Sequence, residues 1–237
     1  ARSRIASGLF TVSTSFSRDD VREIRDRALA EDRPNDWFDP LYVAADGDRD
    51  CVPWSLDGAH PALKSWISER PVSQLFDLDR ARAIVIGCGL GDDAEAIAKL
   101  GFDVTAFDVS PRAVAWCRDR FADSRVDYCV VDLLALDDAW RGRFDFAFEC
   151  RTVQALPLSV RDRAIDAVAS LVSEGGRLVV VTHTRPTEDA PDGPPWPLSP
   201  NELDRFSQSG LTKTWSRDFE KDGRSRCCTE FARSTVG

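Results

Sequence analysis

Short apolar segments alternate four times with helical segments between residues 82 and 183, and this alternation limits the fold more than any other feature of the sequence. We expect strands at residues 82–86, 102–107, 126–131, 144–148 and 177–182. A continuous apolar run, such as residues 83–86, is typical of a parallel strand that is buried on both faces. The pattern therefore predicts an α/β fold whose mostly parallel sheet carries helices on both sides.

The helices between these strands are indicated by their own start and stop signals. We expect one helix over residues 92–100 and another that starts with Ser110 as its cap and Pro111 in its first turn. A third carries apolar residues at helical spacing, including Ile165 and Val172, and two glycines at 175–176 are expected to end it.

Beyond His183 the pattern changes. A Pro-rich loop at 186–200 precedes an expected helix at 201–208 and two strands near residues 211–219 and 226–231. A turn at Asp222 and Gly223 would join these strands as an antiparallel hairpin. Residues 80–237 are thus expected to form a Rossmann-like, doubly wound, mostly parallel sheet of seven strands with an antiparallel C-terminal hairpin.

Residues 1–79 are expected to form an N-terminal extension with lid helices. Residues 1–18 are rich in Ser and Thr, so we expect a mobile segment or one that orders over a ligand. A helix is expected from Asp19 to Glu31, and a short one follows Pro61. Residues 36–42 hold an aromatic cluster in a stretch without periodicity.

Composition excludes several classes of partner. The formal net charge of −9 opposes the phosphate field of nucleic acid, so we expect no nucleic-acid partner. No apolar run approaches the roughly 20 residues that span a bilayer, and no signal-peptide core opens the chain, so we expect a cytoplasmic protein without a membrane partner. The seven cysteines form no CxxC pair, which favours neither a metal site nor a disulfide framework. We expect a monomer or a weak homodimer.

A glycine-rich turn follows the first expected strand. Gly87, Gly89 and Gly91 allow the backbone to turn tightly and to approach a ligand closely. Asp108 ends the second strand, 21 residues after Gly87, where its carboxylate can accept hydrogen bonds from a ribose. Because ligands of open α/β sheets bind outside the carboxyl ends of the strands, these residues predict a nucleoside site, although Asp108 could also be an ordinary strand-end cap.

The residue after this turn indicates which nucleoside binds. A dinucleotide fingerprint GxGxxG would place its third glycine at position 92, where the helix N-terminus approaches a pyrophosphate. Position 92 is Asp, and an anionic side chain there repels a pyrophosphate but tolerates a sulfonium cation. The sequence therefore favours S-adenosyl-L-methionine over NAD.

Residues 84–91, Asp108, Asp132 and Leu133 resemble the glycine-rich, ribose-binding and adenine-binding motifs of class I S-adenosylmethionine-dependent methyltransferases. The resemblance covers roughly residues 80–183. It implies that Gly87, Cys88 and Gly89 line the methionine part of the cofactor, and that Asp108 and Val109 hold its ribose and adenine. Asp132 would meet the adenine amino group, with Leu133 beside the ring, although Asp132 could equally be a helix cap.

The same resemblance places three further residues near the reacting atoms. Glu149, Cys150 and Arg151 follow the fourth strand, where the family has residues beside the sulfonium and the incoming substrate. Residues 52–54, which end at Trp54, are similar to the Pro-Trp element of the thiopurine and thiol or halide methyltransferase group. That group usually has Asp after the Trp, whereas this chain has Ser55.

Two residues are candidates for a general base. His183 ends the fifth strand, and an imidazole titrates near neutrality, although a structural histidine would look the same. Glu149 is the second candidate. Trp37, Trp54 and Trp196 could form an aromatic lid that attracts the sulfonium by cation–π interaction, or could be core residues. Trp37, Arg151, His183 and Trp196 are expected to bind the substrate.

We therefore expect an S-adenosylmethionine-dependent methyltransferase that transfers a methyl group to an S, N or O nucleophile of a small-molecule acceptor. One alternative is a degenerate methyltransferase fold that binds a nucleoside or a partner without turnover. A further alternative, an NAD-dependent oxidoreductase, is disfavoured by Asp92.

Overall fold

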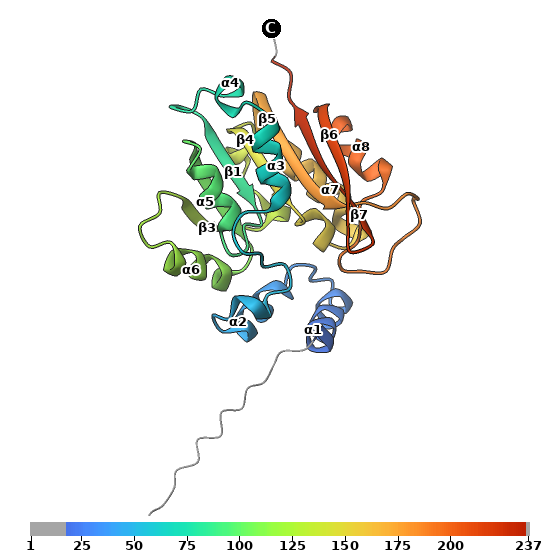
Figure 1. The fold of residues 1–237 in the computed structure, drawn as a ribbon. Coiled ribbons are helices and arrows are strands. Elements are labelled where there is room, and N and C mark those ends of the chain that lie inside the picture. Colours follow the sequence, from blue (N-terminus) through green and yellow to red (C-terminus); the bar gives the residue numbers. More distant parts are fainter. Residues whose placement is uncertain (1–17, 236–237) are drawn as a thin grey trace, which may run out of the picture.

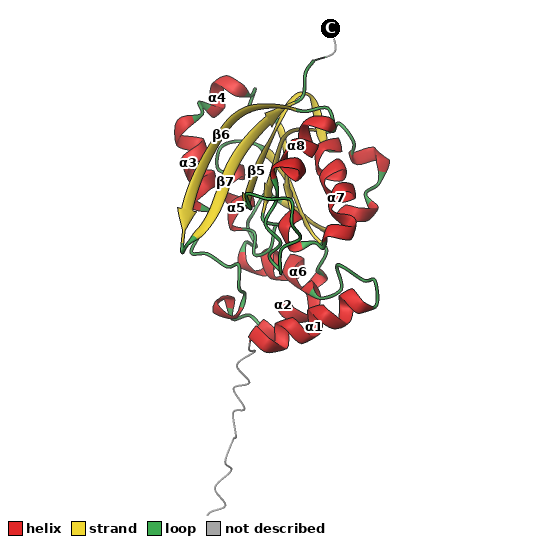
Figure 2. Cartoon of the chain, turned by 90° about the vertical axis from the view of Figure 1, so that its right-hand side faces the viewer, coloured by secondary structure: helices red, strands yellow, loops and turns green. Residues whose placement is uncertain are grey.

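The computed structural model of this chain describes residues 18–235, so the expectation for residues 1–17 lies outside the described residues. Seven strands form one sheet in the order β3-β2-β1-β4-β5-β7-β6, with helices on both faces (Figures 1 and 2). The strands are β1 (Arg82–Ile86), β2 (Asp103–Asp108), β3 (Asp127–Val130), β4 (Phe144–Cys150), β5 (Val172–His183), β6 (Thr212–Lys221) and β7 (Arg224–Ala232). The α-helices are α1 (Arg18–Ala30), α2 (Phe38–Ala45), α3 (Pro61–Glu69), α4 (Val72–Leu75), α5 (Asp92–Ala98), α6 (Pro111–Arg120), α7 (Leu158–Ser170) and α8 (Pro200–Gln208).

The strand pairing confirms the expected fold. Strands β1 to β5 pair in parallel, whereas β7 pairs antiparallel with both β5 and β6. Asp222 and Gly223 both have positive φ angles, of 54° and 67°, which is the geometry of a tight two-residue hairpin turn. The sheet is therefore the doubly wound, mostly parallel sheet of seven strands that the sequence predicts.

Alternate residues of the central strands face two separate parts of the core. Ala83 and Val85 of β1 point to the face covered by α3, α5 and α6, where Trp66 stacks on Phe146 with ring centroids 5.1 Å apart. Ile84 and Ile86 point to the face covered by α7 and α8. Figure 2 shows these two helical layers on either side of the sheet. Burial on both faces explains the continuous apolar strands.

Two expectations about secondary structure are wrong. Residues 36–42 include the start of a helix, α2, which buries Leu41, Tyr42 and Ala45 on one side. The expected helix that carries Ile165 does not reach residues 175–176, because α7 ends at Ser170 and β5 already begins at Val172. The glycines lie inside β5, where the pairing with β4 shifts register, so they form an irregularity in a strand rather than a helix stop.

The segment α1–α2 lies beyond the carboxyl ends of the parallel strands (Figure 1). Asn35, between these helices, donates a hydrogen bond from Nδ2 to Oδ1 of Asp132 at 2.7 Å. Asp39 of α2 accepts one from the hydroxyl of Ser110 at 2.5 Å. The N-terminal segment is thus attached to the loops that follow β2 and β3.

Candidate active site

The glycine turn after β1 is in direct contact with the loop after β4. Gly87 has φ +60°, and a Cβ atom built there would lie only 2.3 Å from Oγ1 of Thr152. The Thr152 hydroxyl in turn donates to the carbonyl of Ile86 at 3.0 Å. β1 and β4 are neighbours, with Ile86 opposite Glu149, and the strand order reverses between them. The turn therefore lies at the switch point of the sheet, where open α/β folds bind ligands.

Asp108 connects the glycine turn to the start of α6. Its carboxylate, at the buried end of β2, accepts main-chain hydrogen bonds from Gly89 and Ser110, both at 3.0 Å. Burial raises the pKa of Asp108 to about 6, although hydrogen bonds from the main chain partly oppose that rise. Each carboxylate oxygen can accept more than one hydrogen bond, so both retain capacity for the hydroxyls of a ribose.

A cavity of about 470 Å³ opens beside Val109, immediately after Asp108. Its walls come from α1, the start of α2 and the residues between them, including Ile24, Asn35 and Asp39. Asp132 is reached through Asn35, and its Oδ1 also accepts from the main-chain N–H of Leu134 at 2.8 Å. Asn35 thus lines the same cavity as Val109 and bonds to Asp132, the two residues expected at the adenine.

The remaining loop residues expected at the cofactor are mostly buried. Cys88 and Leu133 are both almost fully enclosed. Asp92 pairs with Arg120 through both carboxylate oxygens, at 2.9 and 3.0 Å. Arg120 balances the charge of Asp92 inside the protein, so Asp92 does not distinguish a pyrophosphate from a sulfonium as the sequence suggested.

Glu149 ends β4 fully buried and shapes the loop that follows. One carboxylate oxygen accepts main-chain hydrogen bonds from Thr152 at 2.7 Å and from Val153 at 3.0 Å. The other, Oε2, has no hydrogen-bond partner among residues 18–235. Burial raises the pKa of Glu149 to about 7. An unsatisfied buried oxygen is costly, and such groups are typical of functional sites.

The next residues of this loop reach across to the N-terminal segment. Arg151 has φ +65°, a strained conformation for a non-glycine residue, and donates from its guanidinium to the carbonyl of Trp54 at 2.9 Å. Cys150 before it is half-buried. The main-chain N–H of Arg151 still donates to the carbonyl of Val181 in β5 at 2.9 Å, so this residue connects the sheet to the Trp54 segment.

His183 ends β5 next to β7, where it is paired with Arg226. Burial and the nearby guanidinium groups of Arg226, Arg224 and Arg151 lower the pKa of His183 to about 4, so its ring is neutral at neutral pH. The ring faces the buried side chain of Gln154, with Nε2 of Gln154 3.4 Å from Nδ1 of His183.

The structure brings two of the three tryptophans together. Trp37 and Trp54 make an edge contact with ring centroids 6.1 Å apart, and Nε1 of Trp54 donates to the hydroxyl of Tyr42 at 2.8 Å. Trp196 lies on the Pro-rich loop, where its main-chain N–H donates to the carbonyl of Gln154 at 2.8 Å. Within the part of the chain that the structure describes, no ring contact joins Trp196 to the other two.

Three residues of this site were not found from the sequence. Asn35, Gln154 and Arg226 are brought to it by the fold, from the N-terminal segment, the loop after β4 and strand β7. Only Gln154 carried a sequence signal, because it lies a few residues after a strand end that was already expected to face the ligand.

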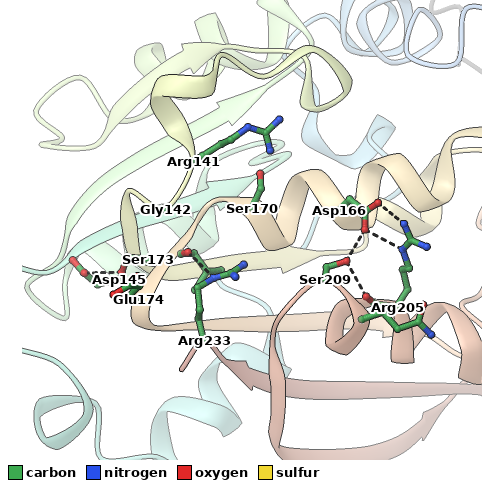
Figure 3. A pocket seen from close by; sticks show the side chains of 12 residues that line it. Arg141, Gly142, Asp145, Asp166, Ser170, Ser173, Glu174, Arg205, Ser209 and Arg233 are labelled. Atoms are coloured by element: carbon green, nitrogen blue, oxygen red, sulfur yellow. Dashed lines mark hydrogen bonds and ion pairs between the residues drawn. The ribbon is translucent and has the colours of Figure 1, made fainter. Parts of the chain in front are cut away.

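A larger cavity, of about 1000 Å³, lies elsewhere, around the ends of α7 and α8 (Figure 3). Several of its charged groups are already occupied, since Arg205 pairs with Asp166 and Arg233 donates to the carbonyls of Ala169 and Val172. These contacts fasten α7, α8 and the C-terminal strand to one another. The smaller cavity beside Val109 lies next to Asp108 at the carboxyl ends of the strands, where open α/β sheets bind ligands, and is therefore the better candidate for the expected nucleoside.

Residues 18–235 contain neither a metal site nor a membrane-spanning helix. No group of three or more His, Cys, Asp or Glu side chains there could hold a metal ion. None of the helices in this part of the chain has the length and the apolar character needed to cross a membrane.

Solved structures of known proteins share this fold. A magnesium protoporphyrin IX methyltransferase from Synechocystis PCC 6803, solved with bound SAM, superposes with a TM-score of 0.62 at 16% identity over 92% of this chain and 99% of that one. A Burkholderia thailandensis 1,6-didemethyltoxoflavin-N1-methyltransferase, solved with bound 1,6-didemethyltoxoflavin and S-adenosylhomocysteine, superposes with a TM-score of 0.60 at 18% identity over 88% of each chain. The fold is therefore that of class I methyltransferases, as the sequence resemblance implies.

The sequence comparisons go further. The family model of thiopurine S-methyltransferase matches residues 47–222, and the chain belongs to this family. The ubiquinone biosynthesis O-methyltransferase of Xanthomonas euvesicatoria is 33% identical over 136 residues. That alignment covers 56% of each chain, so this chain spans about half the length of the curated relatives it matches. The expected family and its cofactor, S-adenosylmethionine, are thus confirmed at the level of the family.

Proposed function

We propose that this protein transfers the methyl group of S-adenosylmethionine to an S, N or O nucleophile of a small molecule. The observation that carries the proposal is the position of Asp108, a buried carboxylate with spare acceptor capacity, bonded to the glycine turn at the switch point of the sheet. Membership of the thiopurine S-methyltransferase family supports the same reaction.

The residues present fit this cofactor. Asp108 would hold the ribose hydroxyls, and Val109 and Asp132 would lie at the adenine, next to the cavity beside Val109. Gly87 and Gly89 would line the methionine part, together with Cys88, Gly91 and Trp54. The unpartnered Oε2 of Glu149 provides a buried acceptor at the adjoining strand end. When bound, the cofactor supplies a methyl group that is already activated by a positively charged sulfur.

The acceptor would lie at the neighbouring strand ends. Arg151 from the loop after β4, His183 from β5 and Arg226 from β7 come together there. Burial and the charges of Arg151 and Arg224 lower the pKa of the Arg226 guanidinium. Several donors in a half-buried place favour an acceptor that carries negative charge or lone pairs close to its nucleophile. Trp37 and Trp196 would cover the acceptor, and Glu149 is the group whose pKa of about 7 suits proton transfer.

Methyl transfer then depends mainly on position. The protein needs to hold the nucleophile in line with the methyl carbon and to exclude water, and such alignment can lower a barrier by about 7–11 kcal/mol. Trp54 contacts both Trp37 and Tyr42 and accepts the Arg151 hydrogen bond, so it would join the cofactor side to the acceptor side. These contacts would keep water away from the reacting atoms.

The test is a methyl-transfer assay with a panel of thiols, phenols and amines, run beside calorimetry with S-adenosylmethionine and its demethylated product. We expect binding of both nucleosides and transfer to at least one acceptor class. Binding without transfer across the panel would indicate a non-catalytic nucleoside-binding protein. Binding of NAD with dehydrogenase activity would replace the proposal by an oxidoreductase.

A further inference from the structure

The amide of Gln154 has only one possible orientation. This side chain, in the short 3-10 turn η4 (Val153–Ala155), is buried and extends to the end of β5. Its Oε1 lies 2.6 Å from the main-chain nitrogen of His183 and 3.0 Å from the hydroxyl of Thr182. A peptide N–H can only donate, so the atom facing it must be the oxygen. The amino end of Gln154 is therefore the end that faces the ring of His183.

This orientation determines where the ring of His183 carries its proton. The amino group of Gln154 can only donate, so Nδ1 of His183, 3.4 Å away, is the acceptor. In a neutral imidazole the other nitrogen then holds the proton, which makes Nε2–H a donor. A second proton on Nδ1 would point at the amino group of Gln154, which disfavours the charged ring.

The charged groups around the ring also favour its neutral form. Arg151 comes from the loop after β4, and Arg224 and Arg226 come from β7. Burial and these three cations lower the pKa of His183 to about 4. A neutral ring with a fixed Nε2–H has no free lone pair with which to remove a proton from an acceptor molecule.

We propose that Gln154 is a positioning residue that holds His183 in the Nε2–H tautomer, so that His183 donates a hydrogen bond to the methyl acceptor and does not act as its base. The location of His183 beside the acceptor rests on the proposed function, whereas the tautomer does not. His183 is therefore not the base that the sequence suggested. Glu149 remains the candidate base for an acceptor that arrives protonated, whereas an acceptor whose nucleophile is already ionised needs no base.

When the acceptor is already ionised, methyl transfer needs no base. Its lone pair forms the bond to the methyl carbon, while the bond from that carbon to sulfur breaks and its electron pair stays on the sulfur. No proton is released, so none has to be accepted. The donors Arg151, Arg226 and His183 would stabilise the negative charge of the acceptor in the ground state and orient it.

Nitrogen-15 NMR of the imidazole rings tests the tautomer directly, without cofactor or acceptor. The sequence has only two histidines, His60 and His183, so loss of one set of signals in His183→Asn assigns them. At pH 7 we expect an unprotonated Nδ1 and a protonated Nε2 for His183. A protonated Nδ1 would overturn the proposal, even if the enzyme transfers methyl groups.

Gln154→Glu tests the positioning role. A carboxylate accepts where the amide donated, so the ring should gain a proton on Nδ1 and its pKa should rise from about 4 toward the ordinary 6.5. Gln74→Glu makes the same change at an exposed position of α4 and should leave both His183 signals unchanged. If Gln154→Glu folds like the parent, as judged by circular dichroism, and moves neither the tautomer nor the pKa, Gln154 does not position the ring.

The pH dependence of kcat/KM supplies a second readout once an acceptor is known. With two thiols of different acidity, the midpoint of the rise in kcat/KM should follow the pKa of each thiol. A midpoint that is common to both thiols and that shifts in Gln154→Glu would instead assign proton removal to His183. Failure of the whole panel to accept a methyl group would refute the proposed function while leaving the NMR result to stand or fall separately.

Discussion

Replacing Gly87 with alanine tests the close contact between the glycine turn and the loop after β4. The added methyl group would lie 2.3 Å from Oγ1 and 2.7 Å from Cγ2 of Thr152, a short β-branched side chain that has little freedom to move. The left-handed backbone at Gly87 costs a non-glycine residue roughly 1–2 kcal/mol. Overpacking adds about 1–3 kcal/mol. The free energy of unfolding should therefore fall by roughly 2–5 kcal/mol.

Gly223 provides a matched control for the backbone part of this cost. It has φ +67° in the β6–β7 turn, and nothing lies within 4 Å of a Cβ atom built there. Gly223→Ala should lower the free energy of unfolding by no more than about 1–2 kcal/mol. Thr152→Ala removes both clashing atoms, so adding it to Gly87→Ala should recover part of the steric cost. The reasoning is refuted if urea denaturation shows Gly87→Ala to be no less stable than Gly223→Ala.

Two further predictions concern buried carboxylates. Glu230 is buried between α3 and the sheet and accepts hydrogen bonds from Trp66, Arg70, Arg177 and Thr214, so Glu230→Gln should lower the free energy of unfolding by roughly 2–4 kcal/mol. Burial acts to raise the pKa of Glu230, but these hydrogen bonds lower it overall. The ionised carboxylate therefore stabilises the fold above the ordinary carboxyl pKa, and this stabilisation is lost as the pH falls. In urea denaturation, the difference in free energy of unfolding between the parent and Glu230→Gln should close below about pH 4. Because the pKa of Asp108 is raised to about 6, calorimetry at pH 5 should find S-adenosylmethionine bound about tenfold more weakly than at pH 7.5. The affinity of Asp108→Asn should not change between these pH values. Equal affinity of the parent at both pH values would contradict the ribose assignment.

The sheet could be predicted because its signals are local. Residues 83–86 read as a buried parallel strand from their own composition, and Asp222 with Gly223 specifies a hairpin turn from two residues. α2 escaped prediction because only three of its eight residues are buried, too few to reveal a period. The glycines at 175–176 are ambiguous by nature, since the same residue ends helices and allows bulges in strands.

The candidate site divides in the same way. Strand-end residues such as Asp108 and Glu149 were predictable, because parallel strands bring their carboxyl ends to one edge of the sheet. Contacts between distant segments were not. Asn35 meets Asp132 across 97 positions, and Gln154 meets His183 across 29, distances over which no periodic pattern operates. The pairing of Asp92 with Arg120 could not be predicted either, because it also joins distant positions of the chain.

The central claim is that Asp108 binds the ribose of S-adenosylmethionine, and calorimetry of Asp108→Asn tests it most directly. Asparagine keeps the size of the side chain and one oxygen for the glycine turn, and Asp103→Asn, at the exposed opposite end of the same strand, is the control. Hydrogen bonds to a charged group contribute about 1.5–3 kcal/mol, so we predict roughly 10- to 150-fold weaker binding in Asp108→Asn and parental affinity in Asp103→Asn. Undiminished affinity in a folded Asp108→Asn protein would contradict the account.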